Sequence, residues 1–150
     1  MYKSSFVHHL TKVLVDIMFF GGILCCGALP FIMPSLAAFL GYPSDTVLPY
    51  TVILILSGLC CIYVLWQLKT IFKTLLSGNP FVEKNISCLR RCSVASILIA
   101  IIFLVKISIW FTIASSIVVI VFALLGLFCL TLKDVFKQAV AYKEENDWTV

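Results

Sequence analysis

Three cysteines and one aspartate come closest, by residue type and spacing, to a chemical site in this sequence. Cys88 and Cys92 lie one helical turn apart, and we expect Cys129 at a similar depth in a neighbouring helix. Three thiolates could bind a soft metal ion. However, there is no C-x-x-C pair, and cysteine is a small residue that is readily buried. We therefore expect packing cysteines, with no metal site and no cofactor.

Asp16 directly precedes the first long apolar run. An ionisable residue inside a membrane is a candidate for proton or cation transport. Asp16 lies only one turn after Lys12, and no second acid lies deeper in the run. We therefore interpret it as an interfacial carboxylate paired with Lys12. The adjacent His8 and His9 would point to different faces of a helix, so we interpret them as surface residues.

Patterns typical of enzymes are missing from the sequence. It contains no glycine-rich phosphate loop, no zinc-protease pattern and no nucleophile elbow. The net charge of +4 does not indicate nucleic acid either, because the basic residues separate apolar runs and do not gather on one soluble face. We expect no catalytic residue, no enzyme activity and no direct contact with nucleic acid.

The composition is that of a membrane protein. Of 150 residues, 62% are hydrophobic and 12% are charged, and the mean hydropathy is +1.12. Soluble domains are about half apolar and about one quarter charged, so these charges are too few to cover a water-exposed surface. We predict a single all-α domain of four transmembrane helices in an antiparallel bundle, with helical cytoplasmic extensions.

The spans follow from the lengths of the uncharged runs. About 20 apolar residues cross a hydrocarbon core of about 30 Å. No charge occurs in residues 17–44 or 46–68, and Lys106 is the one charge in residues 92–132. We predict spans at about 13–33, 46–68, 92–110 and 114–132. The first helix should end near Pro30 and Pro34, because proline removes a backbone donor, and a turn should lie at 111–113.

The positions of lysine and arginine predict the orientation, because short cytoplasmic loops carry the excess of these residues. Ten of the eleven fall on one side of the spans: Lys3, Lys12, Lys69, Lys73, Lys84, Arg90, Arg91, Lys133, Lys137 and Lys143. Lys106 would lie near the outer end of the third span, its stem carrying the ammonium to the interface. We predict a multi-pass protein of the cytoplasmic membrane, with both termini and the 69–91 hairpin in the cytosol.

The first span has an alternative interpretation as a cleaved signal peptide. Its apolar stretch exceeds the usual signal core of about 7–15 residues, so we favour a span. Cleavage would leave three spans with the same orientation.

Apolar residues repeat at helical spacing beyond the spans. One stripe follows the second span: Leu68, Ile71, Phe72, Leu75 and Leu76. A second precedes the first span: Phe6, Val7, Leu10, Val13 and Leu14. A third follows the fourth span: Leu132, Val135, Phe136, Ala139 and Val140. We predict that the bundle continues into the cytosol. Alternatively, one or more stripes lie flat among the lipid headgroups.

Small and special residues predict the turns and the close helix contacts. Gly78 suits a left-handed helix end, and Asn79 before Pro80 suits an N-cap followed by proline at the first helical position, so the next helix should begin at Pro80. Small residues in the first two spans should permit close contact between helices: Gly21, Gly22, Ser57 and Gly58.

Two segments carry a resemblance to a known family. They are Gly78, Asn79, Pro80 and Phe81, and the closing run from Tyr142 to Val150. With four spans in 150 residues, the chain resembles the bacterial membrane family called domain of unknown function 2975. The most specific element is the end, similar to E-E-N-D-x-T-V, although this chain has Trp148 where members tend to have an aliphatic residue. Members are often encoded beside a small helix-turn-helix regulator, so the resemblance implies a membrane partner in gene regulation and no catalytic residue.

We therefore predict a regulatory or interaction protein that acts with a cytosolic partner such as a helix-turn-helix DNA-binding regulator. We expect the basic hairpin to attract the acidic residues of the 133–150 tail. The docking candidates come from the hairpin turn and from this tail: Asn79, Pro80, Phe81, Glu144, Glu145, Asp147 and Trp148. Alternatively, the tail caps the fourth helix and solvates its end. From another class, a small transporter or an immunity-type protein would need polar residues inside the spans. The chain could also form a homo-oligomer.

Overall fold

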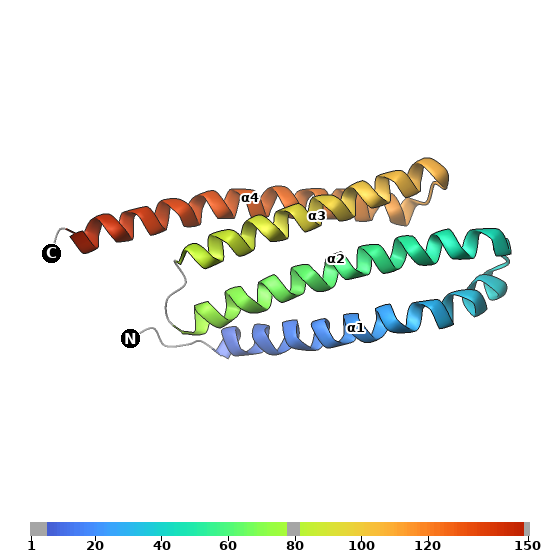
Figure 1. The fold of residues 1–150 in the computed structure, drawn as a ribbon, viewed down its shortest axis with the longest axis horizontal. Helices are drawn as coiled ribbons and strands as arrows, with labels where there is room; N and C mark the ends of the chain where they lie inside the picture. The colour runs from blue at the N-terminus through green and yellow to red at the C-terminus, as the bar shows by residue number, and fades with distance from the viewer. Residues whose placement is uncertain (1–5, 78–81, 149–150) are drawn as a thin grey trace.

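Four long helices form the protein. The computed structural model describes residues 6–77 and 82–148, with α1 at Phe6–Leu40, α2 at Ser44–Leu76, α3 at Glu83–Ile109 and α4 at Ile113–Trp148 (Figure 1). No strand occurs in these described segments. Each helix has the length and apolar composition needed to cross a membrane. The prediction of an all-α membrane protein with four long apolar helices is therefore confirmed.

The helices alternate in direction and lie side by side in chain order (Figure 1). α1 packs on α2, α2 packs on α3, and α3 packs on α4, whereas α1 and α4 do not contact each other in the described part of the chain. The two outer helices thus have one neighbour each. As a result their apolar stripes stay half exposed, with Leu10 at 49% and Val135 at 53%.

The first helix continues past the prolines where we expected it to end. α1 contains Pro30 and Pro34 and reaches Leu40, so that prediction was wrong. Membrane helices tolerate proline because local adjustments and neighbouring groups satisfy the freed backbone carbonyls. α1 ends instead at Leu40, just before Gly41, whose φ of 72° is left-handed, and the backbone N–H of Tyr42 donates to the Ala37 carbonyl at 2.9 Å.

The other two connections differ in how well they were predicted. α3 ends at Ile109 and α4 begins at Ile113, close to the expected turn. α3 begins at Glu83, after Val82 in an extended conformation, which is later than the predicted start at Pro80. The predicted left-handed Gly78 and the Asn79 cap lie outside the described residues.

Aromatic residues mark two levels along α2. The end of the molecule with both short turns, 41–43 and 110–112, is called the outer end, and the opposite end is called the inner end. Tyr42, Tyr50 and Trp110 form ring contacts of 6.3–6.5 Å at the outer end, and Tyr63 contacts Trp66 at 6.4 Å nearer the inner end. α2 rises about 24 Å from Tyr50 to Trp66. This separation suits the aromatic belts found at the two surfaces of a bilayer.

Small residues bring the paired helices close together. A Cβ added at Gly126 of α4 would lie 2.8 Å from Ile97 Cγ1 of α3, and one added at Gly58 of α2 would collide with Cys26 Sγ of α1. The predicted close contact at Gly58 is confirmed. Among the described residues, no heavy atom of another element lies within 4 Å of such a Cβ at Gly21, so the prediction was wrong there. Gly126 was not predicted, and its close contact joins α3 to α4.

Candidate functional site

The inner end of α4 extends beyond the other three helices (Figure 1). Residues 141–146 are all exposed, and Tyr142 has 70% of its surface accessible. Two of the predicted docking residues, Glu144 and Glu145, therefore lie exposed on the last described turns. The backbone of Asp147 and Trp148 continues the helix, but their side chains are outside the described set. The other three candidates, Asn79, Pro80 and Phe81, also lie outside it.

A partly buried hydrogen bond joins the end of α2 to the start of α3. The Thr74 hydroxyl donates to Asn85 Oδ1 at 2.8 Å, and Asn85 has no accessible surface. Polar side chains that bond across membrane helices specify which faces pack together. Sequence analysis did not single out this pair. The sequence feature that could have predicted this contact is the presence of Thr74 before the predicted turn and Asn85 after it, both within helical stretches.

The Asp16 carboxylate forms an ion pair with a different lysine from the one we expected. Lys69 Nζ of α2 lies 2.9 Å from Asp16 Oδ1, and the same ammonium lies 5.6 Å from the ring centres of Phe19 and Phe20. The predicted pairing with Lys12 was wrong, because the neighbouring helix brings a basic residue to the same level. The pair joins α1 to α2 near the inner end, in agreement with an interfacial carboxylate.

The cysteines pack between helices. Val64, Cys92, Ala95 and Cys129 form the core cluster of α2, α3 and α4. The Cys92 thiol donates to the Val64 carbonyl at a sulfur–oxygen distance of 3.9 Å. Within the residues that the structure describes, no three His, Cys, Asp or Glu side chains converge as metal ligands would. The geometry thus gives the buried thiols a packing role.

Lys106 is the charged residue whose burial and contacts the sequence did not predict. It lies one turn before the end of α3, but only 7% of its surface is accessible. Its ammonium donates to Thr112 Oγ1 at 2.8 Å and to Ser115 Oγ at 2.6 Å, and it lies 5.2 Å from the Tyr50 ring centre. The side chain therefore lies at the level of the outer aromatic residues, and protein groups cover it there. The signal was present in the two hydroxyl residues that follow at the start of the next helix.

The residues that make these contacts line one wall of a cavity at the outer end. The cavity has a volume of about 250 Å³ and is lined by residues of all four helices and the 41–43 turn. In the described part of the chain, no carboxylate pairs with the Lys106 ammonium. Two hydroxyls and an aromatic face replace its water shell. The lysine thereby braces the end of α3 against the start of α4.

The fold and these clusters define a helical multi-pass membrane protein whose polar contacts lie mainly toward its two ends. The chain belongs to the family described as "Protein of unknown function (DUF2975)", whose sequence profile matches residues 33–150. This match confirms the resemblance and covers every docking candidate. Comparison with curated proteins found no match, and comparison with solved structures found none.

Proposed function

We propose that this protein is a regulatory membrane protein that recruits a cytosolic protein to the inner end of α4. The observation that supports the proposal is the extension of α4 past its neighbours, with Tyr142, Glu144 and Glu145 exposed. A partner that packs on this end of α4 would bury the tyrosine ring and could pair with Glu144.

The chemistry of this segment favours a partner with a basic and partly apolar surface. A small helix-turn-helix DNA-binding regulator has such a surface, because it must attract phosphate, and the family resemblance implies such a regulator. Exposed ion pairs contribute only about 0 to 1 kcal/mol each. Binding would therefore be reversible and would need several contacts at once. The attraction between the tail and the basic hairpin, and the cytosolic orientation, stay predictions.

Site-specific photocrosslinking in membranes tests the proposal. A photoreactive amino acid at Tyr142 should crosslink a helix-turn-helix regulator, whereas the same group at Phe39, which is 87% exposed near the outer end, should not. Glu144→Lys with Glu145→Lys should reduce the Tyr142 crosslink, because both acids then repel a basic surface. Identical products at both positions, or a crosslink unaffected by charge reversal, would contradict the proposal.

One observation favours the second candidate, a small transporter or an immunity-type protein acting within the membrane. Lys106 supplies a buried positive charge beside a cavity, and such residues often line solute pathways. Lys106→Met should then abolish solute flux into proteoliposomes and leave the Tyr142 crosslink intact. A crosslink to a regulator with no flux would exclude this candidate.

A further inference from the structure

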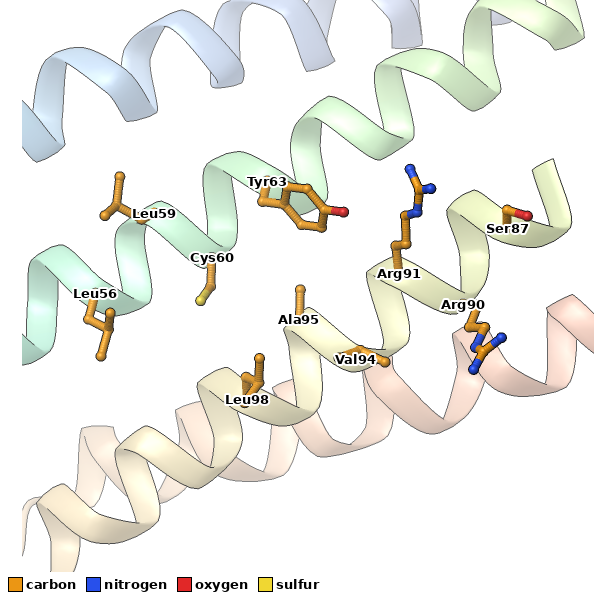
Figure 2. Close-up of a pocket in the computed structure, with 10 residues that line it drawn as sticks. All are labelled: Leu56, Leu59, Cys60, Tyr63, Ser87, Arg90, Arg91, Val94, Ala95 and Leu98. Atoms are coloured by element: carbon orange, nitrogen blue, oxygen red, sulfur yellow. The ribbon is translucent and has the colours of Figure 1, made fainter. Parts of the chain in front are cut away.

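A groove between α2 and α3 changes from polar to apolar along its length. It has a volume of about 560 Å³ and is lined by Leu56, Leu59, Cys60, Tyr63, Ser87, Arg90, Arg91, Val94, Ala95 and Leu98 (Figure 2). The polar residues lie at the inner end of the groove and the leucines lie toward the outer end. In Figure 2, the Arg91 side chain extends from α3 toward α2, on the side where Tyr63 presents its hydroxyl.

Two arginines line this groove: Arg91 extends toward α2, whereas Arg90 extends away from it (Figure 2). Both are exposed, and neither forms an ion pair or hydrogen bond with another residue of the described segments. A guanidinium presents five donors in a planar fork that matches phosphate oxygens. The nearby Tyr63 and Ser87 hydroxyls add donors. The charge and geometry at this end of the groove therefore suit a phosphate group.

The depth of the arginines places that phosphate at a membrane surface. α3 rises about 22 Å from Arg91 to Lys106, most of the thickness of a hydrocarbon core of about 30 Å. The aromatic pair Tyr63 and Trp66 lies on α2 near the same end, as interfacial aromatics do. Arg90 and Arg91 thus lie at the level of lipid headgroups.

The apolar part of the groove distinguishes a lipid from a soluble anion. It continues about 10 Å along α3 from Arg91 to Leu98. Its rim residues Leu56, Leu59 and Leu98 are 49%, 54% and 47% exposed. A soluble phosphate would leave this surface unfilled, whereas a phospholipid chain would lie along it directly below its own headgroup.

We propose that the α2–α3 groove binds one anionic phospholipid of the inner leaflet, with its phosphate on Arg91, additional positive charge from Arg90 at the rim, and an acyl chain against the leucines. Basic pockets between membrane helices on the cytoplasmic side bind acidic headgroups in this way. A zwitterionic lipid binds less well, because its own ammonium group lies close to the arginines. The site is independent of the proposed docking at α4 and needs no protein partner.

Native mass spectrometry of the full chain in detergent measures this preference. Phosphatidylglycerol should bind about tenfold or more tightly than phosphatidylcholine with the same acyl chains. Arg90→Gln with Arg91→Gln should remove that difference. The matched control, Lys73→Gln with Lys137→Gln, removes the same charge from two exposed positions outside the groove and should retain the preference within about twofold. Soluble glycerol phosphate should not displace the lipid.

A second measurement uses the unaltered protein, so it does not depend on the folding of a variant. A phosphatidylglycerol with a photoreactive acyl chain should label peptides that contain residues 56–63 and 94–98. Equal binding of the two lipids, equal loss in both double variants, displacement by glycerol phosphate, or labelling spread evenly over all four helices would each overturn the proposal.

Discussion

The close approach of α3 and α4 at Gly126 allows a sharp test of the packing. In Gly126→Ala, the new Cβ would lie 2.8 Å from Ile97 Cγ1 and 3.4 Å from the Ser93 carbonyl oxygen. Carbon atoms prefer about 3.5–4.0 Å, so one of the helices must move or Ile97 must change its rotamer. Ile97 is β-branched, and such residues have one strongly preferred χ1 in a helix. We therefore expect the helices to separate.

The expected loss combines two opposing terms. Overpacking costs about 1–3 kcal/mol, and replacing a helical glycine by alanine offsets this by up to about 1 kcal/mol. Gly126→Ala should thus lower the unfolding free energy by about 1–2 kcal/mol. The matched control is Gly27→Ala, where no heavy atom of another element in the described segments lies within 4 Å of the new Cβ. That control should be neutral or stabilising by up to about 1 kcal/mol.

Titration with sodium dodecyl sulfate in mixed micelles, followed by circular dichroism, measures both variants. The sharper readout is coupling with Ile97→Ala, which removes the atom in conflict. The double variant should lose about 1 kcal/mol less stability than the sum of the two single variants. If Gly126→Ala matches Gly27→Ala, or if the two effects simply add, α3 and α4 are not packed at this point as described.

Three further predictions concern other contacts and the orientation. Thr74→Val removes the donor to the buried Asn85 and should lower stability by about 1–3 kcal/mol in the same detergent titration. Thr131→Val, which removes an exposed hydroxyl bonded within its own helix, should have little effect. Ser115→Ala removes an acceptor 2.6 Å from the Lys106 ammonium and should lower the unfolding free energy by about 1.5–3 kcal/mol. In a Lys106→Met background the same substitution should lower it clearly less. Equal losses in the two backgrounds would show that Lys106 does not hold α3 against α4 through Ser115. Alkaline phosphatase fused after residue 150 should be inactive and fused within residues 42–46 active, and the reverse result would overturn the orientation.

Helix content and approximate boundaries were predictable because of what a bilayer requires. Backbone groups in hydrocarbon must be satisfied within the segment, so long uncharged runs become helices. This reasoning correctly predicted four helices and the short turn before Ile113. It failed at Pro30 and Pro34, because the cost of a proline depends on whether the surroundings satisfy the freed carbonyls.

Sequence reasoning proposed docking residues at the hairpin turn and in the acidic tail. Among these candidates the structure describes the side chains of Glu144 and Glu145 and places both on exposed turns. The lipid groove could not be predicted in the same way. Arg90 and Arg91 were visible as a basic pair, but the wall opposite them belongs to α2 and is defined only by packing.

The sequence by itself determined that this is a four-helix membrane protein, since hydropathy and helix length are properties of each segment alone. Only the tertiary structure decided which helices meet, that Lys69 pairs with Asp16, and that Lys106 donates to Thr112 and Ser115. The physical reason is that lipid and a helix interface are equally apolar. Hydrophobic periodicity therefore cannot separate the face that meets lipid from the face that meets protein, and small residues and rare polar contacts make that choice.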